Sequence, residues 1–140
     1  MMRKLLAVAL ISLAVACSGG QTESLTIDNA EYRPPLVDGA TGVAYFSITS
    51  TIADRITGVS SPQARAVEIH ESTSAGGMAG MDRLESVDLP AGKTVTFGPG
   101  GLHLMVIAPQ SLPMAATFPI QIALESGRVE TISFAGATAP

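Results

Sequence analysis

The chain has 140 residues, of which 46% are hydrophobic and 4% aromatic, and its formal net charge at pH 7 is −4. An acidic balance excludes nucleic acid as the expected partner, because binding to a phosphate backbone depends on basic residues. Cys17 is the only cysteine, which excludes an internal disulfide and a thiolate metal site in the folded part.

The N-terminal segment has the pattern of an export signal. Arg3 and Lys4 precede an apolar run, Leu5–Ala16, that stops at Cys17. A run of about twelve residues is shorter than the roughly twenty needed to cross a bilayer. Two cleavage patterns fit: Ala14-Val15-Ala16 suits ordinary secretory cleavage, whereas a cysteine directly after it resembles a bacterial lipoprotein signal. We predict the second, with residues 1–16 as the signal peptide and Cys17 as the lipidated first residue.

The remaining chain is predicted to be one domain. Without residues 1–16 it has 124 residues, with six basic and twelve acidic side chains and a net charge of −6. This length suits a single hydrophobic core. Residues 17–24 are small and polar and are predicted to be a flexible tether, which leaves residues 25–136 as the folded domain.

Short stretches rich in Val, Ile, Thr and Phe follow one another, separated by Pro and Gly, and predict β-strands. In chain order they are Leu25–Ala30, Gly42–Ser50, Ile56–Ser60, Ala66–Ser72, Leu84–Leu89, Lys93–Phe97, His103–Ala108, Phe118–Leu124 and Val129–Ala135. Several alternate between apolar and polar residues, as Phe118, Ile120 and Ile122 do, which indicates one buried face. No stretch after the signal has a helical stripe. The sequence therefore predicts an all-β fold, an antiparallel sandwich or barrel.

The two histidines of the chain, His70 and His103, lie in a window that also holds Met78, Met81 and Met105. A soft thioether beside an imidazole suits a soft, reduced metal ion, above all Cu(I). Residues two apart in a strand share a face, so His103 and Met105 are expected to lie together while their neighbours enter the core.

His70 and Met81 can lie close to His103 and Met105 only if the tertiary structure brings their segments together. Val67 and Ile69 are expected in the core, which leaves Glu68 and His70 on the opposite face. Met81 is expected in or beside a glycine-rich connection, residues 75–80. If the ends of the two strands are adjacent, two imidazoles and two thioethers converge near the surface.

Taken one at a time, these residues have ordinary explanations. A methionine such as Met105, beside Leu and Val, more often fills a core than binds a metal. A lone histidine is usually a surface or hydrogen-bonded residue. The clustering favours the metal site, because the rest of the domain has no histidine and only Met114, which is expected to serve packing.

The spacing of the four side chains resembles a known family. His70, Met81, His103 and Met105 follow the pattern H-x10-M-x21-H-x-M of the periplasmic copper(I) chaperone family PCu(A)C. Further similar segments are Gly42–Thr49, Val59–Pro62, Val67–Glu71, Leu89–Gly92 and Pro99–Met105, so that the resemblance spans about residues 25–135. It implies a cupredoxin-like β-sandwich that binds one Cu(I) per chain through these four residues and delivers it to the dinuclear copper centre of cytochrome c oxidase.

Two departures from the family pattern bear on the site. Many members have a methionine directly after the first histidine, where this chain has Glu71, so an auxiliary thioether would have to be Met78. Some members carry a tail rich in His and Met that can hold Cu(II). This chain ends in Gly-Ala-Thr-Ala-Pro, and a second copper site is not expected.

Other functions fit less well. Blue-copper electron transfer needs a cysteine thiolate, and Cys17 precedes the domain. An enzyme is not expected, because no Ser-His-Asp order, carboxylate pair or open metal site with a general base is visible. Periplasmic copper storage or resistance stays open as the alternative function. The expected partners are the copper subunit of cytochrome c oxidase or another copper chaperone, with the protein a monomer on the periplasmic side of the bacterial envelope, held to the membrane if Cys17 is lipidated.

Overall fold

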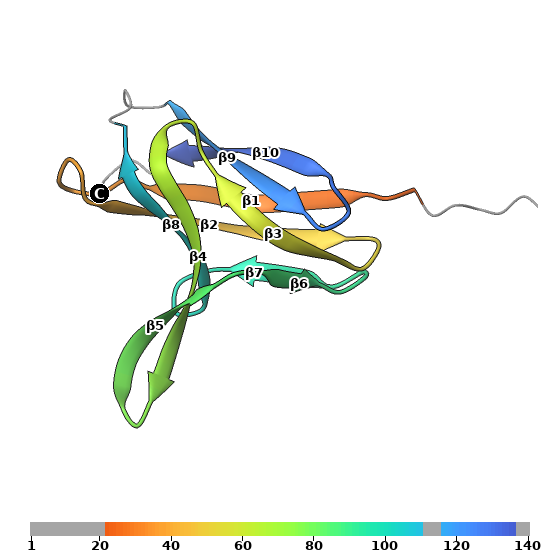
Figure 1. Ribbon diagram of the computed structural model, residues 1–140, viewed down its shortest axis with the longest axis horizontal. Helices are drawn as coiled ribbons and strands as arrows, with labels where there is room; N and C mark the ends of the chain where they lie inside the picture. The colour runs from red at the N-terminus through yellow and green to blue at the C-terminus, as the bar shows by residue number, and fades with distance from the viewer. Residues whose placement is uncertain (1–21, 111–115, 137–140) are drawn as a thin grey trace, which may run out of the picture.

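The computed structural model describes residues 22–110 and 116–136, and in these ranges the chain forms strands and no helix (Figure 1). The strands are β1 Leu25–Arg33, β2 Thr41–Ser50, β3 Asp54–Ser60, β4 Ala64–Ala75, β5 Met78–Leu84, β6 Val87–Leu89, β7 Thr94–Phe97, β8 Leu102–Pro109, β9 Thr117–Leu124 and β10 Val129–Gly136. Nothing in these ranges is a helix that could cross a membrane. The predicted signal peptide, Cys17 and Met114 lie outside the described residues.

The strands form one continuous sheet that folds over into two layers. Its order is β5-β4-β8-β7-β2-β1-β10-β9-β3-β6, with β8 also paired to β2. The first six strands make one layer and the last four the other, and they join where β1 pairs with β10 at Glu31↔Ala135. That pairing and the β7–β8 pairing at Phe97↔Leu102 are parallel. The predicted all-β sandwich is therefore confirmed, with a mixed rather than a purely antiparallel sheet.

Alternating apolar residues of both layers fill the space between them. In β2 the buried apolar side chains are Ala44, Phe46 and Ile48, which alternate with less buried residues along the strand. Phe46 stacks on Phe97 with ring centroids 4.4 Å apart and meets the edge of Phe134 at 5.9 Å. Phe97 is paired with Phe46 within the same layer, whereas Phe134 belongs to β10, so the second contact joins the two layers. Burial of one such side chain contributes about 1.5–3 kcal/mol.

The β4–β5 hairpin differs from the sequence-based expectation. The segment expected to be a glycine-rich connection is a two-residue turn, Gly76-Gly77, with φ of 60° and 79°. Positive φ at both central residues is typical of a type I′ hairpin turn, which glycine adopts without strain. Met81 accordingly lies in a strand, β5. This strand was missed because its Met, Ala, Gly and Asp residues are weak strand formers.

The strand expected at Leu84–Leu89 is divided between two strands of the structure. Its first residue ends β5 and its last three form the separate strand β6. Figure 1 shows the β4–β5 hairpin projecting away from the two layers, whereas β6 lies along the body. β5 and β6 are the two outer strands of the sheet.

A bulge in β1 sets which side chains of this strand enter the core. The pairing of β1 with β2 shifts register between Asp28 and Glu31, and Asn29 has a φ of 56°. Asparagine tolerates this left-handed conformation better than most residues. The extra residue reverses the alternation, so that Tyr32 is buried and stacks on Phe118 at 4.4 Å.

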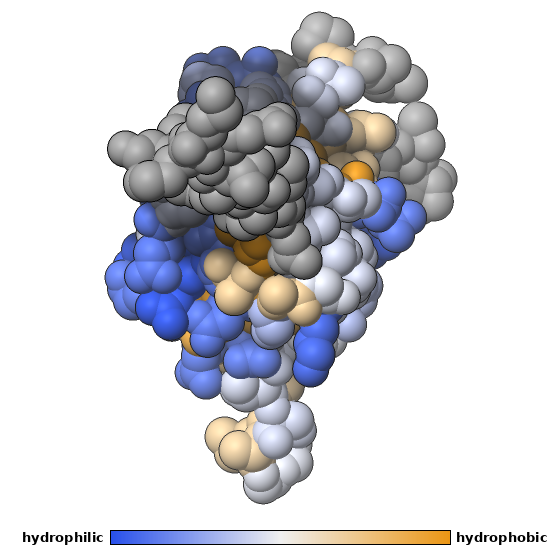
Figure 2. Space-filling view, turned by 90° about the vertical axis from the view of Figure 1, so that its right-hand side faces the viewer, coloured by the Kyte–Doolittle hydropathy of each residue, from blue (hydrophilic) through white to orange (hydrophobic). Residues whose placement is uncertain are grey.

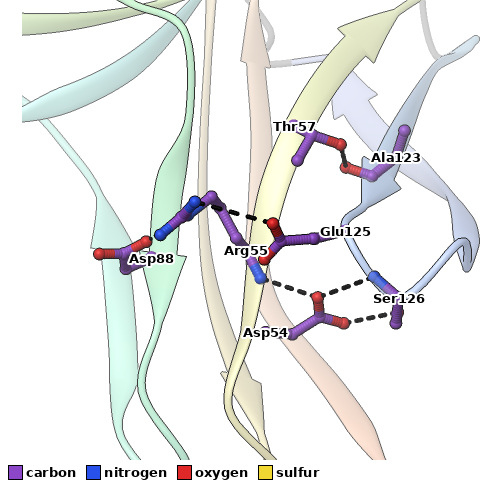
Figure 3. A network of polar contacts seen from close by, with 7 residues as sticks. All are labelled: Asp54, Arg55, Thr57, Asp88, Ala123, Glu125 and Ser126. Atoms are coloured by element: carbon purple, nitrogen blue, oxygen red, sulfur yellow. Dashed lines mark hydrogen bonds and ion pairs between the residues drawn. The ribbon is translucent and has the colours of Figure 1, made fainter.

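A group of polar contacts connects β3 with the outer strand β6 and with the segment after β9 (Figure 3). Arg55 of β3 lies between two carboxylates, with Nε 2.6 Å from Asp88 Oδ1 and Nη1 3.7 Å from Glu125 Oε1. Asp54 accepts hydrogen bonds from Ser126 Oγ at 2.7 Å and from Ser126 N at 3.2 Å. These polar groups satisfy one another at the edge that lies opposite β5 in strand order. The two ion pairs of Arg55 are exposed, and such pairs contribute little to stability.

Candidate metal centre

The two histidines lie opposite each other on neighbouring strands. β4 and β8 are antiparallel with His70 paired to His103, and the ring centroids are 6.0 Å apart. Ile69 and Leu104, one position away on each strand, are buried in the core. Because side chains alternate across a strand, both imidazoles lie on the outer face of this layer. The face expected from the sequence is confirmed for both histidines.

Met81 lies on β5, the neighbour of β4 on the side away from β8. It is paired with Ser72, whose backbone N–H donates to the carbonyl of Gly101 at 3.1 Å on the β8 side. His103 is paired with His70, two positions before Ser72, and its Nε2 lies 3.2 Å from Met81 Sδ across β4. The contact joins β5 and β8, which are not direct neighbours but both pair with β4.

The hydrogen bond of His103 determines which of its ring nitrogens carries the proton and which faces Met81 with a lone pair. His103 Nδ1 is 2.9 Å from the carbonyl oxygen of Gly101. A carbonyl can only accept, so we assign the ring proton to Nδ1, and Nε2 presents its lone pair to the thioether of Met81. Two electron-pair donors thus face each other. A metal ion bonded at about 2.0 Å to nitrogen and about 2.3 Å to sulfur, as in tetrahedral zinc sites, would hold such atoms about 3.5 Å apart.

Met105 belongs to the same face by its register. It lies two positions after His103 in β8 and is paired with Glu68 of β4 and with Val43 of β2. Its neighbour Val106 is buried, which places Met105 on the outer face, partly covered. The structure therefore brings all four expected side chains to one face of three adjacent strands, with β5, β4 and β8 each contributing.

Glu68 is a residue of this face that the sequence analysis placed correctly but gave no role. Its Oε2 lies 2.9 Å from His70 Nε2, and its Oε1 lies 3.7 Å from Arg83 Nε. The hydrogen bond from His70 lowers the pKa of Glu68, burial opposes this, and the charge of Arg83 lowers it further. Glu68 is therefore an ionised carboxylate beside the imidazole at neutral pH. The signal in the sequence is its position two residues before His70 on one strand.

The structure does not bring Met78 to the site. It follows the turn, opposite Ala75, and its side chain is 77% exposed at the end of the hairpin. Three positions separate it from Met81, an odd number, so the two side chains point to opposite faces of β5. Figure 2 shows the hairpin as a narrow extension at the bottom of the molecule.

The fold is that of copper-binding PCuAC domains. The copper-bound PCuAC domain from PmoF2 is 22% identical, with a TM-score of 0.66 over 85% of this chain and 100% of that domain. The solution structure of CuI-DR1885 from Deinococcus radiodurans is also 22% identical, with a TM-score of 0.61 over 86% of this chain and 82% of that one. Both confirm the cupredoxin-like β-sandwich and the resemblance to the PCu(A)C family in fold.

The family assignment comes from the sequence itself. Residues 25–135 match the family model described as "Putative lipoprotein LpqE-like". The chain belongs to this LpqE-like family. Among curated proteins, no relative matches the chain.

Proposed function

We propose that this protein is a periplasmic Cu(I) metallochaperone that binds one Cu(I) through His70, Met81, His103 and Met105. The observation that carries the proposal is the contact of His103 Nε2 with Met81 Sδ at 3.2 Å, in which two electron-pair donors face each other. A thioether and a neutral imidazole form a soft ligand set that favours Cu(I). The likeness of the fold to copper-bound PCuAC domains supports the same reading.

The unequal exposure of the ligands suits release to a partner. Met81 is 58% exposed, whereas His103 is 6% exposed. An incoming thiolate or thioether can replace Met81 while the covered imidazole still holds the ion, so copper moves without a free ion forming. The proposed recipients are the dinuclear copper centre of cytochrome c oxidase or another copper chaperone. The protein itself acts as a carrier and not as an enzyme.

The proposed location is the periplasmic side of the bacterial envelope. In this proposal residues 1–16 are removed as a signal peptide, Cys17 is lipidated, residues 17–24 are a tether and residues 25–136 are the copper-binding domain of a monomer. The description of the LpqE-like family supports a lipoprotein. The start of β1 at Leu25 supports the proposed beginning of this domain.

A competition titration against a Cu(I) chelator tests copper binding. The mature chain carrying Cys17→Ser is expected to bind one Cu(I), and the Met81→Leu, Met105→Leu double variant is expected to lose most of its affinity. Met78→Leu is the matched control, since this thioether points away from the site. A stoichiometry near two, or unchanged affinity in the double variant, contradicts the four-ligand site.

A deletion strain separates delivery from storage. Loss of the protein is expected to lower cytochrome c oxidase activity when copper is scarce, and added copper is expected to restore it. The His103→Ala variant is expected not to complement the deletion. Normal oxidase activity together with hypersensitivity to copper would instead support the storage or resistance function.

A further inference from the structure

We infer that Glu68 is a positioning residue that determines which nitrogen of His70 binds copper: it takes the Nε2 proton in a hydrogen bond and leaves Nδ1 as the ligand atom. The inference rests on the proposed copper site and adds to it a residue outside the four ligands. It concerns the state of the imidazole before copper arrives.

The contact between Glu68 and His70 determines which ring nitrogen of His70 carries the proton. Glu68 Oε2 lies 2.9 Å from His70 Nε2. An ionised carboxylate can only accept a hydrogen bond, so Nε2 of a neutral His70 must carry the proton and donate it. Arg83 steadies the other carboxylate oxygen at 3.7 Å. The side chains of His70 and Glu68 are 15% and 25% exposed, so water competes weakly for this hydrogen bond.

The second nitrogen of the same ring is buried without a partner. His70 Nδ1 is inaccessible to solvent and makes no hydrogen bond to any of the described residues. Buried polar atoms without a partner are rare in native proteins, and each calls for an explanation. With the proton on Nε2, Nδ1 carries a lone pair, and a bound metal ion would satisfy it.

The two histidines then bind through different nitrogens. The Gly101 carbonyl holds the proton of His103 on Nδ1 and leaves Nε2 as its ligand atom. His70 has the opposite arrangement, because Glu68 holds its Nε2. A carboxylate behind a metal-binding histidine fixes the orientation of the ring and makes it a stronger ligand. Glu68 also supplies a negative charge near a site whose four ligands are neutral.

The test is the tautomer of each histidine, measured by long-range ¹H–¹⁵N NMR at one fixed neutral pH in the mature Cys17→Ser chain. Without copper, His70 is expected with its proton on Nε2 and His103 with its proton on Nδ1. On Cu(I) loading, the ¹⁵N shift of His70 Nδ1 and that of His103 Nε2 are expected to change. A proton on His70 Nδ1, or copper bound to His70 Nε2, overturns the inference.

Variants add a second readout. Glu68→Leu is expected to give a mixture of His70 tautomers and a Cu(I) affinity lower by about 10- to 100-fold, the range typical of such supporting residues. Glu71→Leu is the matched control, because Glu71 is an exposed acid three positions after Glu68 on β4, and it should leave both unchanged. If Glu68→Leu changes neither, the inference fails. Absence of Cu(I) binding by the unaltered site overturns the proposed function as well, whereas binding through Nε2 overturns only the role of Glu68.

Discussion

The two-layered body and the β4–β5 hairpin are built on different principles. Phe46 and Phe134 of the body are fully buried and pack across the layers. Residues 74–83 of the hairpin are exposed, and within the described residues β5 pairs only with β4. The proposed ligands come from both regions, with His103 and Met105 on the body strand β8 and Met81 on the hairpin. The body therefore supplies stability, and the hairpin supplies an accessible ligand.

A core substitution tests the first half of this comparison and should have the largest effect. Phe46→Ala leaves a cavity between the layers, and we expect the free energy of unfolding in urea to fall by about 3–5 kcal/mol. Met78→Ala at the end of the hairpin is the control and should change it by less than about 0.5 kcal/mol. Similar losses for both variants would show that the hairpin packs as part of the core.

Met81→Leu tests the second half. Leucine keeps most of the volume but removes the sulfur, so we expect Cu(I) affinity to fall at least about tenfold, or about 1.4 kcal/mol. The free energy of unfolding of the copper-free protein should stay within about 0.5 kcal/mol, because the side chain is exposed. A chelator titration and a urea titration of the same variant give both numbers. A stability loss as large as the affinity loss would contradict a purely ligating role.

Hydrogen exchange can show whether copper joins the two regions. In the copper-free protein we expect the amides of residues 76–82 to exchange much faster than those of β2 and β9, because exposed, weakly packed segments open locally. Cu(I) held by both Met81 and His103 should slow exchange in the hairpin about tenfold or more and leave the core amides nearly unchanged. Mass spectrometry of exchanged peptides measures this. Equal protection of both regions before copper is added would remove the distinction.

We expect the stability of the body to fall in acid because Asp54 loses its charge there. Burial raises the pKa of Asp54, but hydrogen bonds from Ser126 and the Arg55 backbone outweigh it and hold the pKa below its ordinary value. A lowered pKa in the folded state means stability that is present above the unfolded value of about 3.9 and is lost as the pH falls through the folded value. We therefore expect Asp54→Asn to cost about 1 kcal/mol at neutral pH.

The same variant should cost nothing once the pH lies below the folded pKa of Asp54, since the wild-type carboxyl is then neutral too. Unfolding in urea at several pH values between about 2.5 and 7 measures the difference between the variant and the wild type. Asp82→Asn on the exposed hairpin is the control and should have an effect below about 0.5 kcal/mol throughout. A pH-independent difference for Asp54→Asn would mean that its charge is not what the contacts stabilise.

The body was largely predictable because its residues follow the local pattern of strands. The alternation in Phe118–Leu124 gives both the strand β9 and the side chains that enter the core. The same alternation places His103 and Met105 on the outer face, opposite Leu104. These features depend on period and composition, and both can be read from neighbouring residues.

The hairpin and the contacts of the site could not be predicted in this way. β5 forms because the Gly76-Gly77 turn and the register of β4 impose it on residues that favour strands weakly. Two contacts depend on strand order: the pairing of His70 with His103, and the contact of Met81 with His103 across β4. Strand order results from packing of distant segments, which a single sequence does not display locally.

The two outer strands of the sheet, β5 and β6, differ in how readily a strand of another molecule could pair with them. β6 has three residues, Val87–Leu89, and is followed by Pro90, so it offers little to a further strand. β5 has seven residues and no proline, and its outer backbone groups face away from β4. A second molecule adding a strand here would cover the edge that carries Met81. Self-association at high protein concentration and access to the proposed copper site therefore compete for the same strand.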